Sequence, residues 1–580
     1  MPEATLNPAE KAAEAAIRHV YDCIRDRKSF RFEAGAGAGK TYSLISALRY
    51  LIGEQGAALS RRSQRVACIT YTNVAKDEIE SRTDRHPAIY CDTIHAFCWS
   101  MIKDFQAQLR KEVAGLDQWR EKLEESGGVG TRLIQYTLGF RRIETESISL
   151  HHDDVLVLFV ALMNFEKFRT LLTTRHPILF IDEYQDTNIG FAGSLKTQCL
   201  DKEGGPLIGL FGDHWQKIYR GVCGKLEHPA LTEIGKKSNF RSVRVVVDVL
   251  NRIRPELPQE VKDPDAEGFV AAYHTNEWVG QRRTEAHWKG DLPAEVAHDY
   301  LQRLREDLVA HGWEFAPGKT RILMLTHSVL AREQGYSNLA DVFPYNDAFT
   351  EKTDPHIAFF VDTLEPVCRA YEQRRFGDMF AALGGKTPAI RSHRDKLEWA
   401  ADIEGLLKIR KGGTIGDVVD YVRGTQRPHV PEAVENRERE LERIGGNPEP
   451  EEPSSIGILR NLRKVSYQEV VALSRYLEGN TPFATKHGVK GAEFENVLVV
   501  VGRGWNLYNF NQMLELARNP GSIPSGKWDA FERARNLFYV ACSRPQKRLA
   551  VLFTQELSEE ALETLGIWFG QDSIHALGAV

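Results

Sequence analysis

Residues 34–41 read Ala-Gly-Ala-Gly-Ala-Gly-Lys-Thr, which is the sharpest local signal in the sequence. A short predicted strand at 30–33, Phe-Arg-Phe-Glu, precedes this stretch, and an amphipathic helical pattern follows it. Small residues allow successive backbone N–H groups to converge on phosphate oxygens, and the N-terminus of the following helix adds a favourable dipole. A glycine-rich turn alone can be purely structural. Its place between a strand and a helix, with Lys40 and Thr41 in register, predicts a phosphate-binding loop.

This loop defines a predicted nucleotide site. Lys40 is expected to reach the β- and γ-phosphates and Thr41 to ligate magnesium, so the predicted cofactors are ATP and Mg²⁺. Ala34 takes the first glycine position of the general pattern. The residues of this segment that we assign to nucleotide binding are Ala34, Gly35, Ala36, Gly37, Ala38, Gly39, Lys40, Thr41 and Tyr42.

An apolar run, 178–181, ends in two adjacent carboxylates, Asp182 and Glu183. Asp182 can hold the magnesium ion through water, and Glu183 can orient and deprotonate the water that attacks a phosphate. Two acids after a strand are more often a cap than a catalytic pair. The sequence Tyr-Gln-Asp-Thr at 184–187, which follows them directly, favours the catalytic interpretation here.

The alternation of short apolar runs with helical patterns is typical of a parallel sheet flanked by helices. We therefore predict an α/β fold with two parallel-sheet cores, each interrupted by a mostly helical insertion. The expected strands are Phe30–Glu33, Arg65–Thr72, Ile178–Asp182 and Leu207–Gly212 in the first core, and Gly268–His274, Arg321–Thr326, Asn496–Val501 and Arg548–Phe553 in the second. The expected boundaries are 1–100 and 176–238 for the first core, 101–175 for its insertion, 239–337 and 454–580 for the second core, and 338–453 for its insertion, which ends in an acidic linker.

The composition is that of an ordinary globular protein, and its charge excludes a strong overall basic field. The chain has 75 Lys and Arg against 80 Asp and Glu, so any nucleic-acid track must be a local groove. Eight scattered cysteines without a CxxC pair predict free thiols in a reducing cytoplasm. The N-terminus lacks a signal-peptide pattern, and the longest apolar run, 155–163, is too short to span a bilayer. We expect a cytoplasmic protein with no membrane partner.

Seven segments resemble motifs of the UvrD/Rep/PcrA-like superfamily 1 DNA helicases, and they occur in the order of that family. DEYQDT at 182–187 is similar to the second motif of these helicases. The other segments are TYTNVAKDEIESR (70–82), DTIHAF (92–97), GDHWQKIYRG (212–221), SNFRS (238–242), TKHGVKGAEFENV (485–497) and LFYVACSR (537–544). The resemblance implies two RecA-like cores with ATP and magnesium between them, and movement along single-stranded DNA from 3′ to 5′.

The resemblance also assigns the remaining hydrolytic residues. Gln216 would sense the γ-phosphate and couple it to DNA, while Arg241 and Arg544 would reach the γ-phosphate from the second core. Such arginines stabilise charge on the transferring phosphoryl group and are typically worth ~10³–10⁵ in rate. Because both arginines are assigned to the second core, closure of the two cores would be required for hydrolysis. The alternative for either arginine is a surface ion pair.

Contacts to the nucleoside follow from the same resemblance. Phe240 takes the place of a tyrosine and would stack on adenine, and Glu493, in the segment that begins at Gly491, would bind the ribose. Glu10 stands where the family has a glutamine, which can both donate to and accept from adenine, whereas an ionised glutamate only accepts. Two interpretations of Glu10 stay open: relaxed adenine selectivity, or a residue that only starts a helix.

The predicted DNA track combines backbone contacts with aromatic platforms, as in other single-strand motors. For the aromatic residues the alternative is core packing, which is about as plausible for Tyr71 as DNA contact. In the family a tryptophan separates the tyrosine and arginine that are adjacent here, and this departure puts processive unwinding in doubt more than ATP hydrolysis. The residues assigned to DNA binding are Tyr71, Thr72, Asn73, His95, Tyr219, Arg220 and His487.

Both insertions are shorter than in UvrD relatives, and we find no metal-nuclease carboxylate cluster. In size and motif style the chain resembles the helicase-like subunits of bacterial antiviral defence systems such as Gabija, which act with a separate nuclease. Three functions stay open. They are an ATP-dependent DNA helicase acting on single strands or single/double-strand junctions, a regulatory subunit that senses nucleotide and DNA ends for a nuclease, and a degenerate scaffold, which the intact hydrolytic residues disfavour. Whether the pathway is DNA repair or defence also stays open.

Overall fold

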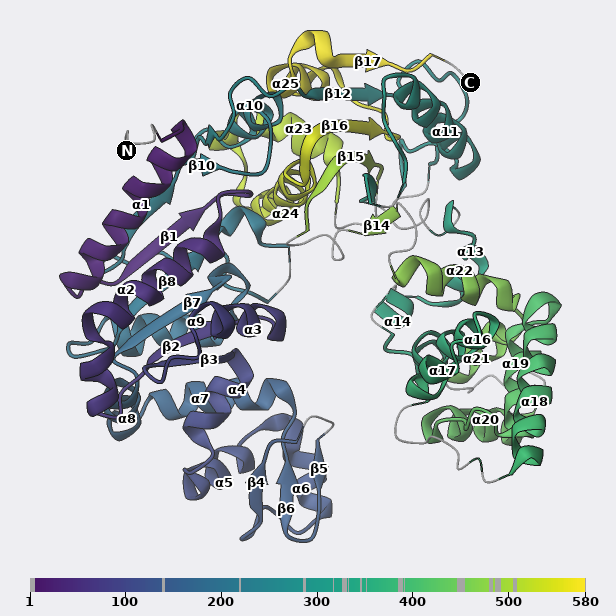
Figure 1. Cartoon of the computed structure of the whole chain (residues 1–580), viewed down its shortest axis with the longest axis horizontal. Coiled ribbons are helices and arrows are strands. Elements are labelled where there is room, and N and C mark those ends of the chain that lie inside the picture. The colour runs from purple at the N-terminus through teal and green to yellow at the C-terminus, as the bar shows by residue number, and fades with distance from the viewer. Residues whose placement is uncertain are drawn as a thin grey trace. The chain divides into compact units, whose positions relative to one another are not determined.

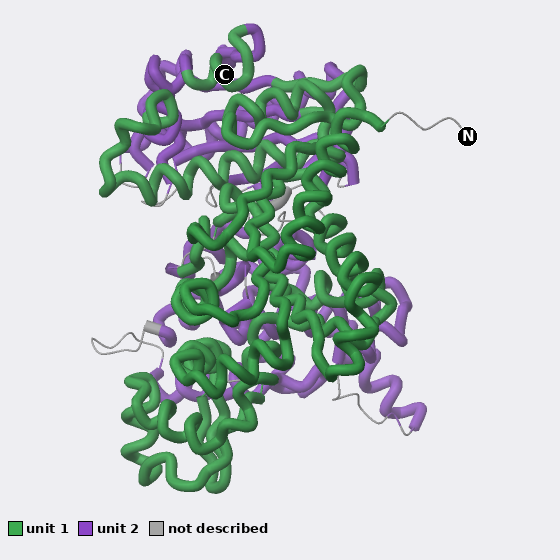
Figure 2. Tube along the Cα trace, turned by 90° about the vertical axis from the view of Figure 1, so that its left-hand side faces the viewer, with its two compact units in different colours: residues 1–270, 516–548, 564–571 green, residues 271–515, 549–563, 572–580 purple. Residues whose placement is uncertain are grey.

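The computed structural model of the chain describes residues 6–137, 141–218, 221–284, 288–316, 318–325, 331, 333–344, 347–350, 352–383, 390, 392–445, 454–478, 483–485, 492–503 and 508–578. By their contacts, the residues divide into two compact units (Figure 2). The first unit comprises 1–270, 516–548 and 564–571, and the second comprises 271–515, 549–563 and 572–580.

The first unit is built on a six-stranded sheet with the order β3-β2-β7-β8-β1-β9 (Figure 1). Its strands are β1 (Phe30–Ala34), β2 (Val66–Thr70), β3 (Ile89–Thr93), β7 (Ile178–Asp182), β8 (Leu207–Gly212) and β9 (Thr232–Lys236). All neighbouring strands pair in parallel, so their carboxyl ends lie at one edge. The four strands predicted for this core are confirmed, and the two edge strands, β3 and β9, are additions.

The centre of this sheet is apolar on both faces, as expected for a parallel sheet covered by helices. The rings of Phe30, Phe180 and Phe211, from three neighbouring strands, pack edge to face with centroids 5.3–5.9 Å apart. The helices of this unit that follow or flank the strands are α1 (Pro8–Arg25), α2 (Lys40–Arg61), α3 (Asn73–Arg82), α4 (Ile94–Ile102), α9 (Ile189–Leu195), α10 (Arg244–Ile253) and α24 (Ser525–Cys542).

The segment inserted between β3 and β7 is mostly helical, with α5 (Gln106–Ala114), α6 (Arg120–Glu125), α7 (His152–Met163) and α8 (Glu166–Arg175). It also holds a small sheet of β4 (Leu133–Gln135), β6 (Ser147–Ser149) and β5 (Arg142–Ile143), which lies beside α6 in Figure 1. The sequence does not predict these strands, because two or three residues are too few to show a period of two. Trp119 is fully buried in this segment, and its Nε1 donates to Asp154 Oδ2 at 3.2 Å.

The second unit has its own six-stranded sheet, with the order β14-β13-β15-β16-β12-β17. Its strands are β12 (Phe269–His274), β13 (Thr320–Met324), β14 (Phe483–Thr485), β15 (Phe494–Val501), β16 (Pro545–Phe553) and β17 (Ile574–Ala576). The four predicted strands are again present. The longer helices of this unit are α11 (Ala294–Ala310), α16 (Glu365–Glu372), α18 (His393–Gly412), α19 (Ile415–Thr425), α20 (Glu432–Ile444), α21 (Ser454–Leu462), α22 (Tyr467–Leu477) and α23 (Phe510–Ala517), while α25 (Glu559–Phe569) has residues in both units. The chain is thus an α/β protein with two parallel-sheet cores and helical insertions.

Two predictions from composition concern the whole chain. All eight cysteines lie in the described residues, and each is a free thiol, as predicted. Within the described part of the chain, no helix combines the length and the apolar character needed to cross a bilayer.

Candidate nucleotide-binding and hydrolysis site

The predicted phosphate loop connects β1 to α2 and is held by residues that follow β9. Gly37 and Gly39 have φ of 74° and 72°, in the region that favours glycine. The Phe240 N–H donates to the Gly37 carbonyl at 2.9 Å, and Asn239 Nδ2 donates to the Ala36 carbonyl at 3.1 Å. The loop is therefore fixed through its carbonyl groups, while its N–H groups are the donors suited to a phosphate.

The small residues of the loop are required by its surroundings. A Cβ added to Gly35 would lie 2.8 Å from Gln259 Nε2, and one added to Gly37 would lie 2.8 Å from Asn239 Oδ1. Both distances are shorter than real Cβ contacts, so a larger residue would push the enclosing side chains away. The cradle fits a nucleotide phosphate bound by backbone N–H groups at a helix N-terminus.

Lys40 and the carboxylates after β7 form the charged centre of the site. Lys40 Nζ lies 2.5 Å from Glu183 Oε2 and 3.9 Å from Asp182 Oδ1. Burial lowers the pKa of Lys40, but these carboxylates outweigh burial and raise the pKa above its ordinary value. Glu183 has φ of 47°, and such strained non-glycine residues gather at functional sites. A carboxylate from Asp182 and the hydroxyl of Thr41 are the oxygen ligands that Mg²⁺ prefers.

Gln216, Arg241 and Arg544 belong to the same compact unit as the phosphate loop. Arg544 Nη2 donates to Gln216 Oε1 at 3.4 Å, and Arg241 Nη1 donates to the Ser543 carbonyl at 3.0 Å. The Arg241 Cβ would lie 2.9 Å from a Cβ added to Gly37. Burial, followed by the charge of Arg241, lowers the pKa of Arg544 to about 9. An anionic phosphate beside Arg544 would favour its charged form.

The side of the loop near Gly39 has the residues expected to face the base. The Phe240 ring is 38% exposed and Tyr42 is 68% exposed, so both have surface available for stacking. Lys236, at the end of β9, is buried below them: its Nζ donates to the Gly39 carbonyl at 3.2 Å and to Ser43 Oγ at 2.8 Å. Burial lowers the pKa of Lys236 to about 8.

Glu10 is engaged at the start of α1. Its Oε2 accepts from the Asn7 N–H at 3.0 Å, while Asn7 Oδ1 accepts from the Glu10 N–H at 2.9 Å. This reciprocal pair is a capping box, which satisfies two N–H groups of the first helical turn. The contact supports the interpretation of Glu10 as a helix-start residue, and a role toward adenine stays a prediction.

The residues predicted for DNA contact that follow β2 and β3 lie at the same sheet edge as the carboxylates. All three of residues 71–73 are exposed. Tyr71 and His95 line a cavity of about 210 Å³ together with Asp182 and Glu183. Burial, and then the neighbouring His152, lowers the pKa of His95, so the ring is neutral at physiological pH. A base stacked on either ring would therefore lie close to the hydrolytic carboxylates.

The remaining predicted residues belong to the second compact unit or lie outside the described residues. Glu493 directly precedes β15, is exposed, and belongs to the second compact unit. Tyr219, Arg220, His487 and Gly491 lie outside the described residues.

Some residues of the site are not predicted from the sequence. Asn239 and Gln259 are buried, bond to each other at 3.1 Å, and both donate to the Ala36 carbonyl. Asn239 lies inside the motif at 238–242, so its position beside Phe240 and Arg241 could have predicted that it belongs to the site. Gln259 belongs to no motif, and only the fold brings it to the loop.

Comparison with known proteins agrees with this geometry. The AAA domain family matches residues 19–222, which include the phosphate loop and the carboxylates after β7. Gabija protein GajB of Bacillus cereus (strain HuB5-5) is 24% identical over 95% of this chain and 96% of its own length. The ATP-dependent DNA helicase PcrA of Staphylococcus aureus (strain Mu50 / ATCC 700699) is 21% identical over 38% of this chain and 37% of its own. Together with the two parallel-sheet cores, these similarities relate the chain to helicases of superfamily 1.

Proposed function

We propose that the chain is an ATP-driven motor that moves along single-stranded DNA from 3′ to 5′ and couples hydrolysis to strand separation. The observation that carries the proposal is that Lys40, Glu183, Gln216, Arg241 and Arg544 belong to one compact unit with the phosphate loop. These residues provide a phosphate-binding cation, a general base and charge stabilisation, which are the parts that phosphoryl transfer to water needs.

Each residue has one proposed task. Asp182 and Thr41 hold Mg²⁺, which neutralises charge on the phosphates. Glu183 removes a proton from the attacking water, Arg241 and Arg544 stabilise the transferring phosphoryl group, and Phe240 stacks on adenine. The exposed residues 71–73 and His95 contact single-stranded DNA.

The proposal is tested by measuring ATP hydrolysis by the purified full chain with and without single-stranded DNA. We expect DNA to accelerate hydrolysis in the wild-type protein and Lys40→Ala to abolish it in both conditions. Lys11→Ala, a lysine on α1, serves as the matched control and should behave like wild type. A wild-type rate that single-stranded DNA leaves unchanged would refute the motor.

A second function is favoured by the similarity to Gabija protein GajB, which extends over nearly the whole chain. In this alternative, the chain senses nucleotide and DNA ends in the cytoplasm and licenses a separate nuclease in antiviral defence, with little unwinding of its own. The adjacent Tyr219 and Arg220 favour it, because the family places a further residue between them. A strand-displacement assay on a 3′-tailed duplex, with and without co-purifying partners, separates the two functions: the motor displaces the strand alone, and the regulator does not.

A further inference from the structure

The turn that follows β8 begins at Asp213, whose fully buried carboxylate makes three contacts. Oδ1 accepts from Arg254 Nη1 at 2.6 Å and from the Trp215 N–H at 3.1 Å. Oδ2 accepts from Gln216 Nε2 at 2.8 Å. Asp213 thus links Arg254, just beyond α10, to the glutamine of the hydrolytic site.

Arg254 is buried between aromatic rings and carboxylates. It is 2% exposed, and its guanidinium lies over the rings of Trp215 and Tyr539, 5.3 and 5.8 Å from their centroids. Its Nη2 is 3.9 Å from Glu33 Oε2, so one guanidinium lies near two buried carboxylates. The planar fork of arginine allows this arrangement, whereas a lysine would offer a single charged point.

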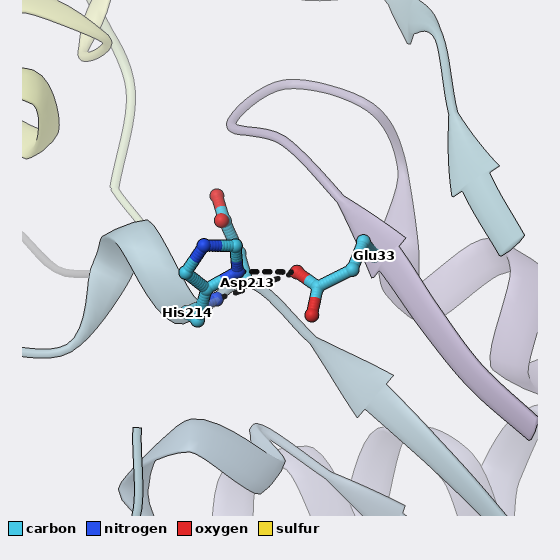
Figure 3. Close-up of side chains that lie close together, drawn as sticks. All are labelled: Glu33, Asp213 and His214. Carbon is cyan, nitrogen blue, oxygen red and sulfur yellow. Dashed lines mark hydrogen bonds and ion pairs between the residues drawn. The ribbon is translucent and has the colours of Figure 1, made fainter. Parts of the chain in front are cut away.

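Figure 3 shows Glu33, Asp213 and His214, whose potential ligand atoms lie within 4.8 Å of one another. Such a group can in principle hold a metal ion. Here two arginines supply positive charge to the carboxylates: Arg254 bonds to Asp213, and Arg31 Nε lies 3.1 Å from Glu33 Oε1. Glu33 also accepts hydrogen bonds from the Tyr184 hydroxyl and from the His214 backbone N–H. The cluster is therefore better described as an arginine-centred network than as a metal site.

This network decides which end of the Gln216 amide faces the nucleotide site. A carboxylate is only an acceptor, so Asp213 selects the Nε2 donor of the glutamine. The amide oxygen must then face the other way, where it accepts from Arg544 Nη2 at 3.4 Å. A phosphate oxygen is an acceptor too, so the glutamine oxygen cannot bind it directly. In this orientation the Gln216 oxygen acts on the γ-phosphate through Arg544.

We propose that Arg254 is a positioning residue for nucleotide sensing: it holds Asp213, and Asp213 fixes the Gln216 amide with its oxygen toward Arg544. The inference rests on the proposed ATPase function of the site. It predicts that replacing Arg254 lowers the affinity for a nucleotide that carries a γ-phosphate. The affinity for a nucleotide without a γ-phosphate should stay almost unchanged.

The test compares Arg254→Met, Arg254→Lys and the control Arg252→Met in the full chain. Arg252 is exposed on α10, and its Nη1 donates to the Trp568 carbonyl at 3.2 Å. Affinities are measured for ADP and for a non-hydrolysable ATP analogue, with kcat and KM for ATP alongside. We expect Arg254→Met to lower analogue affinity and kcat by about 10- to 100-fold, the range for one lost charged hydrogen bond, with ADP affinity unchanged. Arg254→Lys should recover part of both, and Arg252→Met should match wild type.

A double-mutant cycle separates positioning from general damage. In a Gln216→Ala background, Arg254→Met should add less than about a twofold effect on kcat, because residues that act as one unit are not additive. Equal losses of ADP and analogue affinity, or full additivity in the cycle, would overturn the inference. If Arg254→Met does not fold, Asp213→Asn is tested with the same measurements. An asparagine keeps the shape of the side chain, but its amide no longer requires the Gln216 Nε2 group as its partner. Absence of hydrolysis by wild type would instead refute the proposed function.

Discussion

The two sheets of this chain have the same topology, yet their edges differ in chemistry. Numbered along the chain within each sheet, the strands lie in the spatial order 3-2-4-5-1-6 in both, from β3-β2-β7-β8-β1-β9 and from β14-β13-β15-β16-β12-β17. After its first strand, the first sheet continues into the loop that begins at Gly35. The second sheet continues into Thr275 and Asn276, with no glycine-rich loop.

The polar groups at the second edge bind the protein's own backbone. Thr275 is fully buried, and its Oγ1 donates to the Phe553 carbonyl at 3.2 Å. Asn276 Nδ2 donates to the Leu557 carbonyl at 2.7 Å. After the fourth strand, the first sheet places Asp182 and Glu183 near Lys40, whereas the Arg503 N–H of the second sheet donates to Asp291 at 2.9 Å. The two sheets therefore share a topology, and the residues that follow each strand determine whether the edge of a sheet can bind a nucleotide.

The largest expected effect comes from Arg544, a residue of the first compact unit. Arg544→Ala should lower kcat for ATP by ~10³–10⁵, because it removes charge stabilisation from the transferring phosphoryl group. Arg544 is 1% exposed and its Nε donates to the Val540 carbonyl at 2.9 Å, so the variant should also lose thermal stability, and kcat is compared for the folded protein. Steady-state kinetics measure the effect, with Arg533→Ala on α24 as the control. A loss below tenfold would remove Arg544 from the hydrolytic machinery.

The next effect concerns the fourth strand of the first sheet. Glu183→Gln keeps the size of the side chain but cannot accept a proton from water, so kcat should fall by ~10²–10⁴. ADP affinity should change little, because the backbone cradle of the loop is untouched. Equilibrium binding measures the ADP affinity, and single-turnover hydrolysis measures the loss in the rate of the chemical step. Unaltered hydrolysis in this variant would show that another group is the base.

How much of this contrast can be predicted from the sequence depends on the range of the contacts. The phosphate loop, Ile178–Asp182 and Leu207–Gly212 have strong local patterns, and the structure has β7 and β8 with these bounds. Arg254 and Gln259 have no local pattern, because their partners, Asp213 and Ala36, lie 41 and 223 residues away. Such long-range pairs depend on the folded chain and leave no periodicity to detect.

A smaller effect is expected at Asp291, the carboxylate at the second edge. Burial raises the pKa of Asp291 to about 6, against an ordinary value of 3.8. The folded state thus favours the protonated form, so this contribution to stability is fully present below pH 4 and is lost as pH rises through 6. The change is at most about 3 kcal/mol, at 1.36 kcal/mol per pKa unit.

Asp291→Asn resembles the protonated form and should remove this pH dependence. Its free energy of unfolding relative to wild type should rise between pH 4 and pH 7, as measured by urea denaturation at each pH. A difference that stays constant over this range would show that Asp291 does not titrate there. ATP hydrolysis at pH 7.5 should be unchanged.

The smallest effect is expected for Thr275→Val, which places valine after the first strand of the second sheet; Gly35→Val is its counterpart in the first sheet. Thr275→Val removes one hydroxyl that donates to a backbone carbonyl, so the free energy of unfolding should fall by about 1 kcal/mol. The kcat for ATP should stay within about twofold of wild type, because the Thr275 hydroxyl bonds to the backbone of its own unit. Gly35→Val places a Cβ 2.8 Å from Gln259 Nε2 and should abolish nucleotide binding. If Thr275→Val instead reduced hydrolysis as strongly as Gly35→Val, the two edges would share the nucleotide, and the contrast between them would be wrong.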